Sequence, residues 1–314
     1  MSGIGSPAVA TEQASPRFTQ LDAWPVAVQI EALYESQLDA LAAIRPTLPA
    51  IAAAAAAAIE RLQDTRGRLA YAGAGSSARL GAQDGAELEP TFDWPRERLV
   101  LLIAGGTGAL TEAVENAEDD ADAARAAVRD AAIGPHDVVV ALAASGATPY
   151  TLACLVEARA AGALAIGVAN SPHAPLLDAA DHAVLVETGA EPIAGSTRMK
   201  AGTAQKVVLN LLSTAIMTGL GRVHAGRMVD MRARNEKLRR RAVAMVCELA
   251  ACPPQTARAA LAACAMRVKP AILVARGVNP EAAQALLSTH RGSLRAALLT
   301  LWGSYASHTQ ALDL

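Results

Sequence analysis

The sequence is poor in aromatic residues, in cysteine and in net charge, and each shortage limits what the chain can do. Aromatic side chains make up 3% of the 314 residues while alanine is abundant, which predicts helices packed closely on small side chains. The four cysteines form no C-x-x-C pair and no metal-ligand spacing with histidine, so we expect free thiols and no metal site. A net charge of −2 provides no basic field for nucleic acid or an anionic membrane. An anionic substrate would have to be held by local donors.

The sequence shows no export signal and no clear membrane span. MSGIGSPAVATEQASPRF at the start has no basic segment followed by an apolar core, so no signal peptide is expected. PAIAAAAAAAIERL is too short to cross a bilayer and ends in charged residues, which predicts a helix of a soluble protein. We therefore expect a cytoplasmic protein that has no membrane partner.

Five short apolar runs recur along the chain, and amphipathic segments of helical length lie between most of them. The predicted strands cover residues 68–72, 99–104, 137–142, 164–169 and 183–187. This alternation predicts an α/β fold, a doubly wound parallel sheet with helices on both faces. After residue 187 the pattern is helical, with breaks at Gly, Pro and Asn. We expect a loose N-terminus (1–20), an α/β domain with N-terminal helices (21–250) and a small helical domain (251–314).

Two predicted strands end in turns that combine glycine with small hydroxyl residues. The first turn is GAGSS at 73–77 and the second is ASGAT at 144–148. The carboxyl ends of parallel strands meet at one edge of a sheet, and the start of a helix attracts anions through its backbone N–H groups. Two such turns suit one compact phosphate better than an extended pyrophosphate.

A dinucleotide is the alternative ligand for the first turn. Gly73-x-Gly75-x-x-Ala78 fits the G-x-G-x-x-G/A pattern, which is a weak signal alone. The acidic residue expected about twenty positions later is missing, because the second strand ends in LLIAGGTG. A glycine turn that merely connects a strand to a helix explains one such loop more readily than two with matching hydroxyls.

Carboxylates follow the first turn and the second strand. GAQDGAELEPTF contains Glu87, and AVENAEDDADAA contains Glu115 and Glu118, which would share one face if residues 109–118 were helical. A carboxylate beside a phosphate site can act as an acid or a base, whereas a solvated acidic helix face is the alternative. The solvated face is preferred for Glu112, Asp119 and Asp120. For Glu87 and Glu118 the residues alone leave both open.

A third segment, IAGSTRMKAGTAQKVVLNLLSTAIM (193–217), is predicted to continue as a long helix with an apolar face. Ser196 or Thr197 is the expected N-cap. Arg198 and Lys200 lie near the start of this helix, where cations oppose the helix dipole. We therefore expect a cation here to face an anion or carboxylates, and Arg198 is the better candidate for ligand contact because hydroxyl residues precede it.

GAGSSARLGAQDGAELEPTF, AVENAEDD, DVVVALAASGATPY and GSTRMKAGTAQK together resemble the N-acetylmuramic acid 6-phosphate etherase family in order and spacing. That family has a sugar isomerase (SIS) fold and is related to glucokinase regulatory protein. The resemblance runs from about residue 65 to 245 and implies a five-stranded SIS sheet. It also implies a homodimer with sites near its interface. The C-terminal part resembles a small ubiquitin-associated (UBA-like) bundle, for which we expect a packing or dimer-supporting role.

The resemblance implies cleavage of the lactyl ether of a phosphorylated amino sugar. With the sugar ring open, the aldehyde at carbon 1 acidifies the proton on carbon 2. Loss of that proton and protonation of the ether oxygen at carbon 3 expel D-lactate, and water then adds to give N-acetylglucosamine 6-phosphate. The reaction needs an acid and a base but no metal or organic cofactor, and the resemblance assigns these proton transfers to Glu87 and Glu118.

The same resemblance assigns the substrate contacts. The implied phosphate and sugar contacts are Gly75, Ser76, Ser77, Ser145, Gly146, Thr148, Thr197 and Arg198. One departure stands out, because Ala147 occupies the position where the family usually has an arginine. A phosphosugar aldose–ketose isomerase and a non-catalytic phosphosugar-binding regulator are the alternative functions. Retention of both glutamates argues against the regulator, since binding alone needs no acid/base pair.

Overall fold

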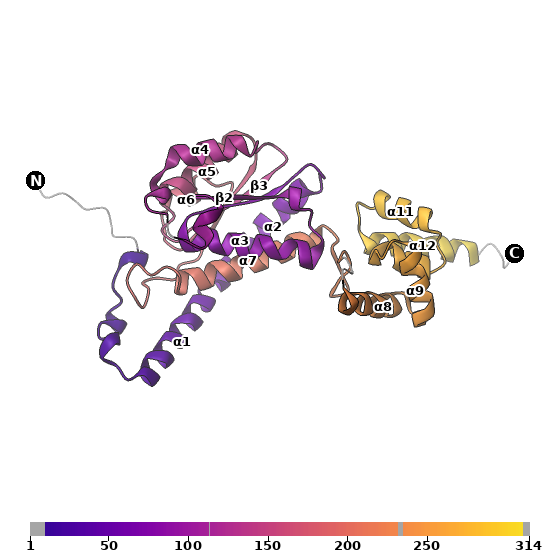
Figure 1. The fold of residues 1–314 in the computed structure, drawn as a ribbon, viewed down its shortest axis with the longest axis horizontal. Helices are drawn as coiled ribbons and strands as arrows, with labels where there is room; N and C mark the ends of the chain where they lie inside the picture. Colours follow the sequence, from indigo (N-terminus) through magenta and orange to yellow (C-terminus); the bar gives the residue numbers. More distant parts are fainter. Residues whose placement is uncertain (1–9, 113, 232–234, 310–314) are drawn as a thin grey trace, which may run out of the picture. The chain divides into compact units, whose positions relative to one another are not determined.

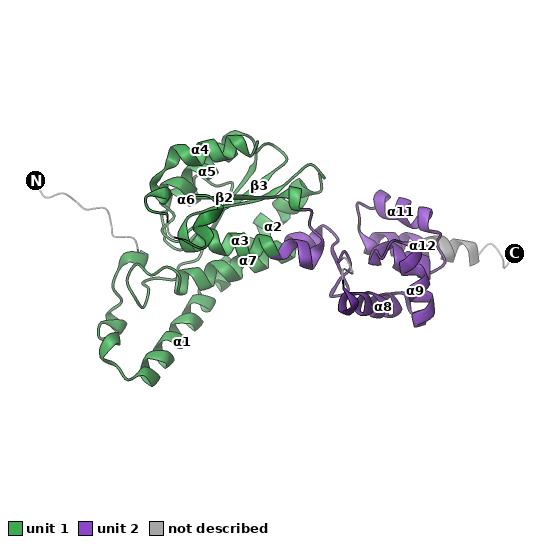
Figure 2. Cartoon of the chain, viewed as in Figure 1, with its two compact units in different colours: residues 1–86, 96–215 green, residues 87–95, 216–314 purple. Residues whose placement is uncertain are grey.

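The computed structural model describes residues 10–112, 114–231 and 235–309 (Figure 1). The chain divides into two compact units (Figure 2). Unit 1 comprises Met1–Ala86 and Arg96–Ala215, and unit 2 comprises Glu87–Pro95 and Ile216–Leu314. The sequence predicted three segments, 1–20, 21–250 and 251–314, whose limits differ from those of the two units. These limits stay a prediction.

Unit 1 is built on a five-stranded parallel sheet with the order β2-β1-β3-β4-β5. The strands are β1 Leu69–Gly73, β2 Leu99–Ile103, β3 Val138–Ala143, β4 Leu164–Ala169 and β5 His182–Leu185. The predicted α/β class and parallel sheet are confirmed, and each predicted strand end moves by at most two residues. The chain leaves β1 toward one side for β2 and returns to its other side for β3. The gap between the ends of β1 and β3 is therefore the switch point, where ligands bind in open α/β sheets.

Helices cover both faces of this sheet. The helices that begin in unit 1 are α1 Val26–Ala42, α2 Leu48–Leu62, α3 Gly75–Phe92, α4 Ala121–Asp130, α5 Pro149–Ala160, α6 Pro175–Asp178 and α7 Lys200–Gly219. Helices α4, α5 and α6 lie on one side of the sheet, and α2, α3 and α7 lie on the other (Figure 1). Buried alanines such as Ala72, Ala124 and Ala141 fill the layer between β1, β3 and α4. The predicted close packing on small side chains is thus observed.

A buried ion pair joins the starts of the two central strands. The Arg68 guanidinium lies 2.6 Å from the Asp137 carboxylate, which also accepts the backbone N–H groups of Arg68 at 2.9 Å and Gly134 at 3.0 Å. Asp137 is 3% exposed. Its carboxylate raises the pKa of Arg68 and holds β1 and β3 in register at the end opposite to the switch point.

Short 3-10 helices and turns connect the main elements of unit 1. They are η1 Ala10–Glu12, η2 Pro16–Phe18, η3 Leu21–Ala23, η4 Arg45–Thr47, η5 Arg96–Arg98, η6 Thr107–Leu110 and η7 Ala117–Asp119. Within the predicted loose N-terminus, Thr11 and Phe18 are buried, while residues 1–9 lie outside the described residues. The helical stretch Val26–Leu62 contains one window long and apolar enough to cross a membrane by composition alone, and 28% of that window is buried. One such stretch is weak evidence for a membrane span.

Unit 2 contains a bundle of short helices. Its elements are the hairpin β6 Val223–His224 and β7 Arg227–Met228, followed by α8 Glu236–Ala250, α9 Pro254–Ala263, α10 Val268–Ala275, α11 Pro280–Thr289 and α12 Leu294–Thr309. Leu261, Ile272 and Leu287 belong to its apolar core. Lys269 is also buried, and its ammonium lies 2.6 Å from the Asp230 carboxylate. The predicted C-terminal helical bundle is therefore present.

Candidate functional site

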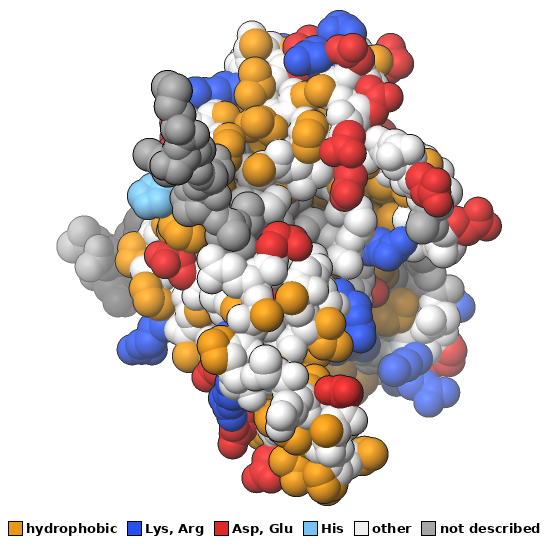
Figure 3. All heavy atoms as spheres, turned by 90° about the vertical axis from the view of Figure 1, so that its left-hand side faces the viewer, with side chains coloured by type: hydrophobic (Ala, Val, Ile, Leu, Met, Phe, Trp, Pro, Cys, Tyr) orange, Lys and Arg blue, Asp and Glu red, His pale blue; other side chains and the backbone are white. Residues whose placement is uncertain are grey.

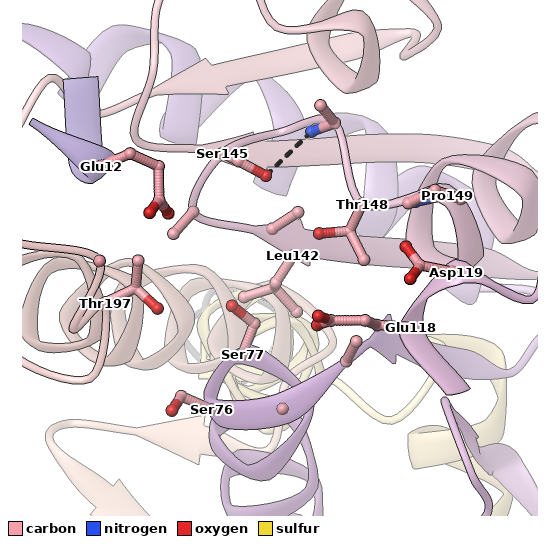
Figure 4. A pocket seen from close by; sticks show the side chains of 16 residues that line it. Glu12, Ser76, Ser77, Glu118, Asp119, Leu142, Ser145, Thr148, Pro149 and Thr197 are labelled. Atoms are coloured by element: carbon pink, nitrogen blue, oxygen red, sulfur yellow. Dashed lines mark hydrogen bonds between the residues drawn. The ribbon is translucent and has the colours of Figure 1, made fainter. Parts of the chain in front are cut away.

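A cavity of about 460 Å³ opens in unit 1 at the carboxyl ends of β1 and β3, where the switch point lies. It is lined by residues 74–77, 142–145, 147–149 and 118–119, together with Glu12, Gly195 and Thr197 (Figure 4). Both predicted phosphate turns thus contribute to the same cavity, together with one of the two predicted glutamates.

The first turn places backbone donors at the cavity because a helix starts there. Gly75 has a φ of +52° and opens α3, a conformation that favours glycine. The hydrogen bonds of α3 begin with the Ala78 N–H, which donates to the Ala74 carbonyl at 3.2 Å. The N–H groups of residues 75–77 precede this bond and, with the helix dipole, can bind an anion.

The second turn is shaped by Gly146, which has a φ of +66°. A Cβ at this position would lie 2.3 Å from the Ala174 Cβ, so only glycine fits. Ser145 accepts the Ala147 N–H at 3.2 Å, and Thr148 is the N-cap residue of α5. The turn therefore presents two hydroxyl groups to the cavity, and the exposed Ala147 offers no charged group beside them.

A chain of buried side-chain amides fixes the Ser77 hydroxyl. The Val186 carbonyl accepts from the Asn170 Nδ2 at 3.1 Å, which turns the Asn170 oxygen toward the Gln205 Nε2 at 2.9 Å. The Gln205 oxygen is then left to accept from the Ser77 hydroxyl at 2.8 Å. We call the Val186 carbonyl and the side chains of Asn170, Gln205 and Ser77 the buried amide chain. Because the Ser77 proton is directed to Gln205, the backbone N–H is the donor that Ser77 can offer to an anion.

Glu191 positions the third predicted segment. Its carboxylate accepts the N–H groups of Lys200 at 2.8 Å and Ala201 at 2.9 Å, and burial raises its pKa. The predicted N-cap at Ser196 or Thr197 is therefore wrong, because α7 begins at Lys200 and Glu191 satisfies its first N–H groups from outside the segment. The turn before α7 carries Thr197 into the cavity.

Arg198 is exposed and does not belong to the residues that line this cavity. Its expected ligand contact stays a prediction.

Glu118 and Asp119 reach the cavity from the short helix η7 (Figure 4). The condition under which Glu115 and Glu118 would share a helix face is not met, because residues 114–116 lie outside any helix and Asn116 has a φ of +59°. Glu115 and Glu118 therefore share no helix face. Asp120, expected on a solvated face, is the N-cap of α4 and accepts the Ala123 N–H at 2.8 Å.

Glu87 lies on an exposed position of α3, within unit 2, and does not line the cavity. Asp84, one turn earlier, is buried and accepts hydrogen bonds from the Tyr71 hydroxyl at 2.7 Å and the Asn210 amide at 2.8 Å. Burial, with the charge of Asp84, raises the pKa of Tyr71 well above its ordinary value. Asp84 thus joins β1, α3 and α7 and is not a group of the cavity.

Three residues of the site were not predicted from the sequence. Glu12 lies in a segment whose composition suggested a loose terminus, and Asp119 looked like a solvated acid. Gln205 lies in GTAQK, within the most specific part of the family resemblance. Its place in this motif was the one sequence signal that could have indicated a role for Gln205 in the site.

The comparisons with known proteins agree with this geometry. Residues 50–159 match the family described as glucokinase regulatory protein N-terminal SIS domain, and residues 110–215 match the SIS domain. The N-acetylmuramic acid 6-phosphate etherase of Deinococcus radiodurans is 49% identical over 278 residues, which is 88% of this chain and 91% of the relative. The etherase of Cronobacter sakazakii is 44% identical over 92% of this chain and 97% of its own length.

A third relative supports the same conclusion. The N-acetylmuramic acid 6-phosphate etherase of Rubrobacter xylanophilus is 42% identical over 289 residues, covering 92% of this chain and 95% of the relative. The similarity thus extends over nearly the full length of each relative, well beyond the phosphate turns that many SIS domains share. The chain belongs to the N-acetylmuramic acid 6-phosphate etherase family.

Proposed function

We propose that this chain is a carbon–oxygen lyase that cleaves the lactyl ether of N-acetylmuramic acid 6-phosphate into N-acetylglucosamine 6-phosphate and D-lactate. The observation that carries the proposal is that both glycine- and hydroxyl-containing turns and Glu118 line one cavity. The chain in which they do so belongs to the etherase family. The four cysteines carry free thiols, which fits action in a reducing cytoplasm.

The two turns hold the phosphate in this proposal. The contributing residues are Gly75, Ser76, Ser77, Ser145, Gly146 and Thr148. Backbone N–H groups at the start of α3 supply donors that need no reorganisation, and the hydroxyls of Ser145 and Thr148 face them across the cavity (Figure 4). Thr197 lines the same cavity from the turn before α7 and contacts the sugar. Arg198 follows it in the chain and would approach the sugar once substrate is bound.

Glu118 moves a proton in the elimination. Its carboxylate points into the cavity from the side opposite to Thr197 (Figure 4). A group held there can take the carbon 2 proton of the open-chain sugar, or protonate the ether oxygen at carbon 3. The family resemblance assigns the two proton transfers to two glutamates, so a second group is expected beside Glu118.

We propose that the second group is Glu87 and that a second copy of the chain supplies it. Glu87 follows Gly75 by twelve helical steps, a rise of about 18 Å, and Glu87 is exposed. Helix α1 provides a surface for such a homodimer, because Val26, Ile30 and Tyr34 form a stripe along it and are 61–70% exposed. Figure 3 shows apolar side chains gathered at the lower end of one face, where Figure 1 places α1.

Purified protein incubated with N-acetylmuramic acid 6-phosphate tests the proposal. We expect equal amounts of D-lactate and N-acetylglucosamine 6-phosphate. Absence of lactate together with interconversion of hexose phosphates would support an isomerase instead. Tight binding of the sugar phosphate without turnover would support a regulator.

Mixing two inactive variants tests the shared site. In mixed dimers of Glu87→Gln and Glu118→Gln, one of the two sites regains both glutamates, so random reassortment restores about a quarter of the sites. No recovery of activity would place Glu87 and Glu118 of the same chain in one site.

A further inference from the structure

Glu12 is a third carboxylate of the cavity, and neither phosphate binding nor the proton transfers account for it. It comes from η1 (Ala10–Glu12), far from the other lining residues in sequence. The neighbouring Thr11 is fully buried, and its carbonyl accepts the Gly195 N–H at 3.0 Å. The N-terminal segment is thus attached to the turn that carries Thr197.

The shape of this turn accommodates the Glu12 side chain. Gly195 has a φ of +74°, and a Cβ at this position would lie 3.0 Å from the Glu12 Oε2. The carboxylate therefore occupies space that a larger residue at position 195 would take. Figure 4 shows it directed into the cavity, with Glu118 and Asp119 on the other side.

The chemistry of the carboxylate limits its partner. Within the described part of the chain, no hydrogen bond or ion pair reaches the Glu12 carboxylate. A carboxylate accepts hydrogen bonds, so its partner on a ligand must be a donor. A phosphate or a second carboxylate would be repelled, whereas a hydroxyl or an amide N–H would be bound.

We propose that Glu12 is a specificity-determining residue that accepts a hydrogen bond from an uncharged donor of the sugar, a hydroxyl or the amide N–H. This inference rests on the proposed function, because it takes the phosphate to lie at the two turns. Glu12 then keeps negatively charged parts of the substrate away from its side of the cavity, and this orients the sugar relative to Glu118.

Calorimetric titration of Glu12→Ala and Glu12→Gln with two probes, inorganic phosphate and N-acetylglucosamine 6-phosphate, tests the inference without turnover. We expect Glu12→Ala to weaken binding of the sugar phosphate about tenfold and Glu12→Gln to weaken it less, because a neutral acceptor makes the weaker hydrogen bond. Binding of inorganic phosphate should not weaken in either variant. Glu60→Gln, an exposed glutamate of α2 away from the cavity, should match the unchanged protein with both probes.

Equal weakening for both probes would overturn the inference, and so would unchanged binding of the sugar phosphate in Glu12→Ala. 2-Deoxyglucose 6-phosphate, which has no donor on carbon 2, distinguishes the two donors: a loss that it shares indicates a hydroxyl, and a loss confined to the acetamido sugar indicates the amide N–H. A protein that binds these probes yet releases no lactate would refute the proposed function and leave the role of Glu12 standing.

Discussion

Replacing Gln205 by leucine should loosen the phosphate site and destabilise unit 1. Gln205 is 1% exposed and joins Ser77 to Asn170 in the buried amide chain. Leucine is close to glutamine in size, so the change removes two hydrogen bonds with little change in packing. The fully buried Asn170 oxygen loses its donor, whereas Ser77 can turn its proton toward the cavity.

The expected cost follows from that difference. A buried polar atom left without a partner costs about 1–3 kcal/mol, and here the cost falls mainly on Asn170. We therefore expect the free energy of unfolding to fall by about 2 kcal/mol. Without the Gln205 contact the start of α3, whose backbone N–H groups face the cavity, is held less firmly, so KM for the phosphosugar should rise more than kcat falls.

Urea denaturation followed by circular dichroism, together with steady-state kinetics, measures both effects. Gln83→Leu is the matched control, because Gln83 is an exposed residue of α3 that does not line the cavity. The reasoning is refuted if Gln205→Leu unfolds at the same urea concentration as Gln83→Leu and keeps the same KM.

Three further predictions follow from other parts of the structure. Asp137→Asn should lower the free energy of unfolding by about 3 kcal/mol, because it leaves the partly buried Arg68 without its counter-charge; a urea midpoint equal to that of the unchanged protein would contradict this. Iodoacetamide should leave Cys154 unmodified in the native state and reach the less buried Cys247, since burial raises the pKa of the Cys154 thiol to about 12; mass spectrometry that finds Cys154 alkylated first would refute it. Ala147→Arg should lower KM several-fold by adding a guanidinium at the exposed edge of the phosphate turn, and an unchanged KM would show that the position does not reach the phosphate.

The sheet and the phosphate turns could be predicted because their signals are local. Apolar runs with glycine at their ends mark β1 and β3, and the helix that follows each turn is part of the same pattern. The positions of Glu115 and Glu118 were harder to predict, because a single backbone angle between them decides whether they share a helix face. Asn116, with its positive φ, lies directly before the short η7 and separates Glu115 from Glu118.

Contacts between distant segments explain what the sequence could not show. The Thr11 carbonyl accepts a hydrogen bond from the Gly195 N–H, although the two residues lie far apart in the sequence. Neither residue type predicts this contact. Glu191 likewise caps a helix that starts nine residues later. The role of Gln205 depends on the orientation of Asn170, which a backbone carbonyl at the end of β5 fixes.

The most direct test of the account is the release of D-lactate from N-acetylmuramic acid 6-phosphate by Glu118→Gln, measured beside its binding of inorganic phosphate. The variant should bind phosphate as the unchanged protein does and release no lactate. Lactate release at the unchanged rate would contradict the assignment of proton transfer to this cavity.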